Sequence, residues 1–161
     1  MLLTAGSKVV YPSQGPCVVG AIVQKVVDGA PLSFYPLAAL DGSGGEVFVP
    51  VDKVEALGVR LLLDRSEIPK LLGHLTKAAG TAENWKQRTM DNLKLFASGS
   101  TFDLAEIVES LTELSKKKSL LPRDGLILER ARKLLVSEIS EVMGEPKSAA
   151  EEQIDKALNS R

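Results

Sequence analysis

The chain changes character near residue 65, and this change constrains its fold more than any other feature of the sequence. Glycines, prolines and β-branched residues dominate the first part, whereas apolar residues with a helical repeat dominate the second. Two periodicities in a chain of 161 residues favour two small domains over one large domain. We therefore predict an α+β protein with a small β-barrel at residues 1–64 and an all-α domain at residues 65–161.

The first part has the pattern of a small barrel. Strand-like runs occur in "SKVVYP", "CVVGAIVQKVV", "LSFYPLAAL" and "EVFVP", and the turn sequences "VDGAP" and "DGSGG" separate the later ones. Pro36 cannot donate to a sheet ladder, so its segment should be an edge strand or contain a bulge. Short strands in such close succession are typical of an SH3-like or Tudor-like barrel.

The second part is predicted to form consecutive helices. In each of them apolar residues recur at intervals of three and four, which is the pattern of a helix with one buried side. The boundary signals are residues that cap a helix, prolines that open one and glycines that end one. We expect helices to begin at or next to Ser66, Asn84, Ser100, Pro122 and Ser148, and two of them to end at Gly99 and Gly144.

The charge balance bears on the partners of the protein. Twenty basic and twenty-one acidic residues give a net charge of −1. A protein that binds nucleic acid mainly by non-specific attraction to phosphate normally carries a clear basic excess, so any nucleic-acid contact is expected to be local. The sequence has no signal-peptide pattern and no apolar run near the roughly 20 residues that span a bilayer, so we expect a cytoplasmic protein without membrane contact.

Cysteine and histidine are too few for several kinds of site. Cys17 and His74 are the only residues of their kind, which excludes disulfides and zinc sites built from several such ligands. Cys17 lies in an apolar run, so we expect a buried thiol. His74 is expected on the solvated side of a helix.

No catalytic constellation is recognisable in the sequence. The glycine cluster "DGSGG" leads into a strand rather than a helix, so it is expected to be a hairpin turn and not a phosphate site. Most carboxylates fall at helix positions expected to face solvent, such as Glu106, Glu109, Glu113 and Glu138. We therefore expect no enzyme activity, no cofactor and no metal.

The single tryptophan, Trp85, lies at the start of the second predicted helix. Leu93 and Phe96 are expected to mark the buried side of that helix. Trp85, Lys86 and Arg88 then fall in or near its first turn, where a rigid ring projects beside cations and backbone amides. Such a cluster suits a nucleic-acid backbone with a base step alongside. By its residues alone, however, a lone tryptophan more often packs in a core or between domains.

Four segments of the chain together resemble the CarD/CdnL family of bacterial transcription regulators. They are "GSKVVYPSQG" at residues 6–15, "VFVPVDKVEALGVR" at 47–60, "NWKQRTMDNLKLFASG" at 84–99 and "LILERARKLLVSEIS" at 126–140. Their order, their spacing and the change from barrel to helices make the combined match specific. The resemblance covers nearly the whole chain.

The resemblance implies a monomeric adaptor without catalysis. The N-terminal domain, similar to the polymerase-binding module of the transcription-repair coupling factor, is expected to bind the β subunit of RNA polymerase holoenzyme with the housekeeping sigma factor. The helical domain is expected to reach promoter DNA at the upstream edge of the transcription bubble. There Trp85 is expected to wedge into the minor groove and stabilise the open complex. Lys86 and Arg88 are then expected to contact phosphate, and Asn84 to cap the helix or touch the DNA backbone.

The polymerase contacts carry over from the family less completely. Lys25 occupies a basic position that resembles one facing the β subunit, but Phe48 stands where some relatives have arginine. An apolar contact through Phe48, Val49 and Pro50, or strand pairing along the barrel edge, is the expected replacement for the charged contact.

Two interpretations from other classes stay open. The protein can be an adaptor between proteins only, in which the barrel binds a partner strand or peptide and Trp85 is buried between the domains. It can also be an enzyme with an unrecognised site, which the missing pairs of nucleophile and base disfavour.

Overall fold

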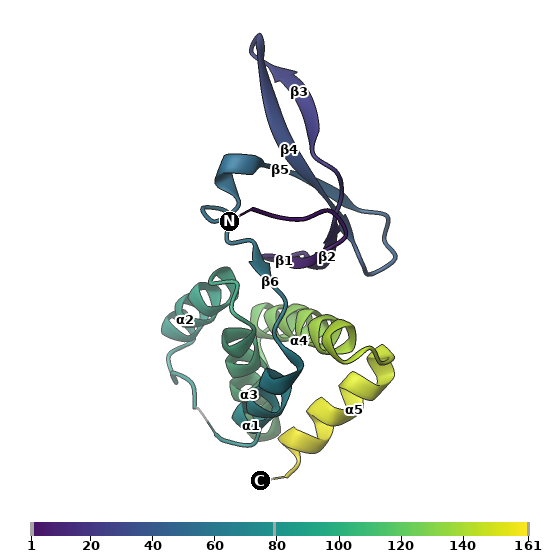
Figure 1. The fold of residues 1–161 in the computed structure, drawn as a ribbon. Coiled ribbons are helices and arrows are strands. Elements are labelled where there is room, and N and C mark those ends of the chain that lie inside the picture. The colour runs from purple at the N-terminus through teal and green to yellow at the C-terminus, as the bar shows by residue number, and fades with distance from the viewer. Residues whose placement is uncertain (1, 79, 161) are drawn as a thin grey trace. The chain divides into compact units, whose positions relative to one another are not determined.

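The computed structural model describes residues 2–78 and 80–160, and the chain divides into two compact units, Met1–Leu62 and Leu63–Arg161 (Figure 1). The first unit is built on a β-sheet and the second consists of helices. The predicted α+β class is therefore confirmed. The two units meet in the sequence two residues before the boundary that the change in composition predicted.

The sheet unit has six strands, all paired in antiparallel fashion. Five of them follow the order β3-β4-β2-β1-β6, and β5 pairs with β4 on the other side. The sheet curls around one core (Figure 1). The elements are β1 (Lys8–Tyr11), β2 (Gly15–Val19), β3 (Val23–Val27), β4 (Ala30–Ala39), β5 (Glu46–Pro50), the short 3-10 turn η1 (Val51–Lys53) and β6 (Arg60–Leu61).

The core of the sheet unit consists of residues that alternate along its strands. Tyr35, Leu37 and Val49 are buried there, and the neighbours of these residues in the strands point outward. The hydroxyl of Tyr35 accepts a hydrogen bond of 3.1 Å from the backbone N–H of Leu3, which ties the N-terminal segment to the sheet. Cys17 is also in this core, as its apolar surroundings in the sequence predicted.

The hairpin between β3 and β4 follows from two residues. Val27 pairs with Ala30, which leaves a two-residue loop of Asp28 and Gly29. Both have positive φ, 51° and 81°. Positive φ at both central positions is the geometry of a type I′ turn, whose twist matches that of antiparallel strands. The turn predicted from "VDGAP" is confirmed.

Pro36 lies in the middle of the sheet, so of the two expected alternatives the edge strand is wrong and an irregularity of the bulge type is present. β4 pairs with β2 and β3 along one side and with β5 along the other. Pairing along the first side is interrupted between Val19 and Val23, opposite Pro36, where the Pro36 carbonyl accepts a hydrogen bond of 2.8 Å from Gly20. The ladder is therefore irregular at the position where proline supplies no N–H.

The helical unit packs α1, α3, α4 and α5 around one apolar core. α2 packs against α3 and α4 and adds only partly buried apolar side chains to that core. None of the described helices is long and apolar enough to span a membrane. The elements are the 3-10 turn η2 (Arg65–Glu67), α1 (Ile68–Leu75), α2 (Trp85–Ala97), α3 (Thr101–Lys117), α4 (Pro122–Met143) and α5 (Lys147–Leu158).

The expected cap positions are correct for three helices and displaced for two. Asn84 caps α2, and Pro122 opens α4. Near Ser66, the N-cap residue is instead Asp64, which precedes the 3-10 turn η2 that leads into α1. The Asp64 N–H donates a hydrogen bond of 3.1 Å to the Glu67 carboxylate. Ser148 lies inside α5, whose N-cap residue is Pro146. Ser100 is the N-cap residue of α3 as expected, although its side chain makes no capping hydrogen bond.

Two carboxylates expected at the surface are buried. Glu109 is 1% exposed and Glu138 is 2% exposed. Glu138 accepts hydrogen bonds from the N–H of Leu63 at 3.0 Å and from the hydroxyl of Thr101 at 2.7 Å. These bonds replace solvation that the carboxylate loses on burial. Glu138 thus joins α4 to the start of α3 and to the segment that precedes α1.

Candidate functional site

Asn84 and Trp85 begin α2, and the Asn84 side chain fixes the first turn of that helix. Its Oδ1 atom accepts hydrogen bonds from the N–H groups of Lys86 at 2.9 Å and Gln87 at 3.2 Å. Asparagine is among the best residues for this role. Because these two amides are already bonded, they contribute less to phosphate binding than the sequence pattern suggested.

Trp85 is 46% exposed at this helix start. Lys86 Nζ lies 5.6 Å from the centre of the ring, within the range of a weak cation–π contact. We call Asn84, Trp85 and Lys86 the tryptophan tip. It presents an aromatic ring and an exposed cation on a turn that is held by a cap.

Arg88 does not belong to the tryptophan tip, and its predicted contact with phosphate does not fit its position. Arg88 as a whole residue is 2% exposed. Its Nε and Nη2 atoms donate to the Asp124 Oδ2 atom at 3.2 and 2.8 Å, and its Nη1 atom donates to the carbonyls of Ala82 and Glu83 at 3.3 and 3.4 Å. Arg88 therefore ties the segment before Trp85 to the first turn of α4.

The buried side of α2 is also different from the prediction. Leu93 is 57% exposed, whereas Asn92 beside it is 3% exposed. Arg88 and Asn92 lie one turn apart and form a polar inner side, which Phe96 continues as a partly buried residue. The apolar residues Trp85 and Leu93 are consequently left on the outer side of the helix.

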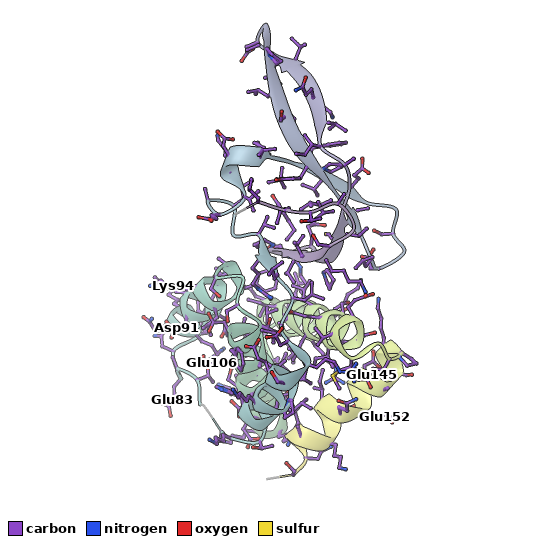
Figure 2. The ribbon with its side chains drawn as sticks, in the orientation of Figure 1. Glu83, Asp91, Lys94, Glu106, Glu145 and Glu152 are labelled. Atoms are coloured by element: carbon purple, nitrogen blue, oxygen red, sulfur yellow. The ribbon has the colours of Figure 1, made fainter. Side chains whose placement is uncertain are left out.

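The surroundings of the tryptophan tip carry both signs of charge. Figure 2 shows Glu83, Asp91 and Lys94 around α2. Asp91 accepts a hydrogen bond of 2.7 Å from the Gln87 side chain. This mixture of charges gives no extended basic surface next to Trp85, in keeping with the net charge of −1.

A second candidate site lies on the outer side of the sheet unit. Lys25 of β3 pairs with Leu32, and Phe48 of β5 pairs with Pro36. Leu32 and Pro36 are four residues apart in β4, so all four side chains lie on one side of the sheet. The Lys25 ammonium group lies 3.5 Å from the centre of the Phe48 ring. The two residues expected to meet polymerase are thus in contact with each other.

The outer sheet surface is apolar around this pair. We call Lys25, Val27, Leu32 and Phe48 the sheet patch; its three apolar members are 41%, 45% and 37% exposed. Val49 points the other way and is fully buried, so its side chain cannot take part in the predicted contact with polymerase. Among the described strands, β5 pairs with β4 alone, which leaves the other edge of β5 for main-chain contacts.

Comparison with known families assigns both units. Residues 3–62 match the family model described as "CarD-like/TRCF RID domain". Residues 70–155, more than half of the chain, match the model described as "CarD, C-terminal domain". The chain belongs to the CarD/CdnL family. The resemblance seen in the four sequence segments is confirmed.

One solved structure similar to this CarD-family chain is the N-terminal domain of Myxococcus xanthus CarD, determined in solution. The match has 45% sequence identity and a TM-score of 0.32, and it covers 37% of this chain and 79% of that one. By its family, the protein is a transcription regulator with an RNA polymerase-interacting domain. Lys25 and Phe48 lie in the segment matched to that domain, and Trp85 lies in the segment matched to the CarD C-terminal domain.

The residues that sequence reasoning missed are the anchors of the site. Asp124 stands in the first turn of α4, where a carboxylate interacts favourably with the helix dipole. That local signal does not disclose its partner 36 residues away.

Proposed function

We propose that this CarD-family regulator stabilises the promoter open complex, with Trp85 wedged into the minor groove at the upstream edge of the transcription bubble. It acts as a monomer and without catalysis. The observation that carries this proposal is the half-exposed ring of Trp85 on a capped helix start beside Lys86. An aromatic wedge that is exposed before it meets DNA needs no rearrangement to enter an opened base step.

The effect on promoter opening follows from selective binding. DNA opening is reversible, and a protein that binds only the opened junction lowers the free energy of that state and slows its closure. Stacking of one base on an aromatic side chain contributes about 1–3 kcal/mol, which corresponds to a lifetime longer by about 5- to 150-fold.

Rigid support of the ring is part of the proposed mechanism. Arg88 fixes the carbonyls of Ala82 and Glu83, which immediately precede the tryptophan tip. Asn84 fixes the amides that follow. A preorganised tip loses less conformational entropy on binding, so more of the stacking energy is available to hold the DNA open.

The sheet patch is the proposed contact with the β subunit of RNA polymerase holoenzyme that carries the housekeeping sigma factor. It combines exposed apolar area with the single cation of Lys25, and the open edge of β5 adds main-chain donors and acceptors. Edge strands of this kind accept a partner strand readily. The expected location is therefore the cytoplasm, on promoters occupied by polymerase.

Delivery by polymerase explains why the protein needs no basic surface. A tethered module experiences a high effective concentration of its target, so a weak intrinsic affinity is sufficient. We expect weak, salt-sensitive binding to free promoter DNA. A tight and salt-resistant complex with DNA in the absence of polymerase would contradict this scheme.

The decisive experiment compares the wild type with Trp85→Ala for the lifetime of open complexes on polymerase holoenzyme. The control is Met90→Ala, because Met90 is also exposed on α2 and lies outside the tryptophan tip. Both variants are used at concentrations that saturate polymerase. We expect Trp85→Ala to shorten the lifetime towards that of polymerase alone and Met90→Ala to leave it nearly unchanged. An unchanged lifetime in Trp85→Ala removes the wedge role.

The adaptor that contacts proteins only is tested separately by collisional quenching of Trp85 fluorescence with acrylamide. Trp85 is the only tryptophan, so the signal has one source. An exposed ring is quenched strongly in the free protein. A shielded ring in solution would favour burial between the domains.

A further inference from the structure

A pocket lies between α2 and the start of α4, beside the polar inner side of α2. Its volume is about 130 Å³. Leu93 and Phe96 of α2 and Leu126 and Ile127 of α4 form apolar walls. A cavity of about 150 Å³ with such a lining holds benzene, so this pocket has the size of one small ring.

The side chain of Asn92 lines this pocket and carries an unused donor. Asn92 is 3% exposed, and its Nδ2 atom has no hydrogen-bond partner among the residues that the structure describes. A buried donor without an acceptor is costly and is rare in native proteins. An acceptor atom of a ligand placed against Asn92 would remove this cost.

Two cations stand at the mouth of the pocket. Arg123 and Arg130 line it and are exposed, and in the described parts of the chain neither forms a salt bridge. The Arg130 guanidinium lies 5.4 Å from the centre of the Phe96 ring, so it stands directly over an apolar wall. The nearby carboxylate of Asp124 is already paired with Arg88. The mouth therefore favours an anion.

We propose that this pocket binds a small aromatic acid that carries a hydrogen-bond acceptor on the side of the ring opposite the acid group. The ring lies against the apolar walls, the acceptor meets the Asn92 amide, and the carboxylate meets Arg123 and Arg130. The three parts of such a ligand match the three kinds of surface that the pocket presents. This site goes beyond the proposed DNA contact, and its test uses neither DNA nor polymerase.

The direct test follows side-chain and backbone amide resonances of the full chain by ¹H–¹⁵N NMR during titration with 4-hydroxybenzoate. We expect saturable shifts at the Asn92 side-chain amide with a dissociation constant on the order of millimolar, as befits a ligand of so few atoms. Benzoate lacks the inner acceptor and should bind about fivefold more weakly. The amide 4-hydroxybenzamide lacks the charge and should bind about threefold more weakly.

Three outcomes would overturn the proposal. The first is the absence of a saturable shift at Asn92. The second is an equal shift with inorganic phosphate, which indicates an adventitious anion only. The third is a shift of these resonances by duplex promoter DNA but not by any of the acids, which makes the pocket a part of the DNA contact.

Variants separate loss of the pocket from loss of the fold. Leu126 is 57% exposed, so Leu126→Glu should fold normally while it places a negative charge on the pocket wall. The matched control is Leu121→Glu, since Leu121 is 44% exposed and does not line the pocket. We expect Leu126→Glu to weaken 4-hydroxybenzoate at least tenfold and Leu121→Glu to leave it unchanged. Equal binding by both variants would also overturn the proposal.

Discussion

The guanidinium of Arg88 and the carboxylate of Asp124 form a buried ion pair, with 2.8 Å between Nη2 and Oδ2 and side chains that are each 3% exposed. Two helices meet through this pair, since Arg88 belongs to α2 and Asp124 to the first turn of α4. The same guanidinium also holds two carbonyls of the segment before Trp85. The position of the proposed wedge therefore depends on a contact that is remote from it in sequence.

Arg88→Met should strongly destabilise the helical unit. The change leaves the Asp124 carboxylate buried without its cation, and breaking such a pair costs about 3–5 kcal/mol. The measurement is the free energy of unfolding from urea titration followed by circular dichroism. Lys86→Met serves as control because Lys86 is exposed two residues earlier, and its effect should stay within about 0.5 kcal/mol.

A double variant shows whether the unpaired charge is the cause. Arg88→Met combined with Asp124→Leu removes both charges and should recover part of the lost stability, because an apolar pair can replace a buried ion pair. The comparison is the loss of unfolding free energy that Asp124→Leu causes in the wild type and in Arg88→Met. If the two losses are equal, Arg88 and Asp124 are not coupled, contrary to what their distances indicate.

Signals that act within a few residues predicted much of the fold. Positive φ at Asp28 and Gly29 follows from their residue types, and Asn84 caps the helix that it precedes. Pro122 likewise opens α4 at the place where its missing N–H is not needed. In each case the residue and the structure that it determines are neighbours in the chain.

Burial of charge could not be predicted in the same way. Arg88 and Glu138 look like surface residues because their partners Asp124 and Thr101 lie 36 and 37 residues away. The buried side of α2 was predicted incorrectly for the same reason. Because Arg88 and Asn92 occupy the inner side of that helix, Leu93 is left exposed on its outer side.

Thr101→Val should reduce stability by about 1.5–3 kcal/mol, because the change removes a hydrogen bond of 2.7 Å to the buried carboxylate of Glu138. The two side chains have similar shapes, so packing changes little. Urea unfolding measures the difference. Thr112→Val, at a partly exposed position of the same helix, should change stability by less than about 0.5 kcal/mol. Equal effects of both variants would mean that the Glu138 contact contributes nothing measurable.

The thiol of Cys17 should make the stability of the sheet unit decrease in alkaline solution. Burial raises the pKa of Cys17 in the folded protein above its ordinary value. The stabilising contribution is then complete below the unfolded pKa of about 8.5 and is lost as the pH rises through the folded pKa, because only the unfolded chain ionises between the two values.

The measurement is the unfolding free energy of the wild type and of Cys17→Ala between pH 7 and pH 10. Above the unfolded pKa, the wild type should lose up to about 1.4 kcal/mol per pH unit relative to Cys17→Ala. Slow reaction of the folded thiol with a disulfide reagent at pH 8 should accompany this loss. A difference between the two proteins that is constant with pH would contradict the burial effect.

Phe48→Ala should weaken binding to RNA polymerase about tenfold without unfolding the protein, since Phe48 is 37% exposed and contributes apolar area to the sheet patch. The Lys25 ammonium group lies 3.5 Å from the centre of the Phe48 ring. Lys25→Gln should therefore weaken polymerase binding less in the Phe48→Ala background than in the wild type. Leu57→Ala is the control, because Leu57 is 40% exposed and lies outside the sheet patch.

Val49→Ala tests whether binding is lost through unfolding and not through a lost contact. Its buried side chain should affect stability first, by about 1–3 kcal/mol, and polymerase binding only as far as folding is lost. Co-purification of each variant with polymerase, alongside its unfolding curve, distinguishes the two effects. Full polymerase binding by Phe48→Ala would move the contact away from the sheet patch.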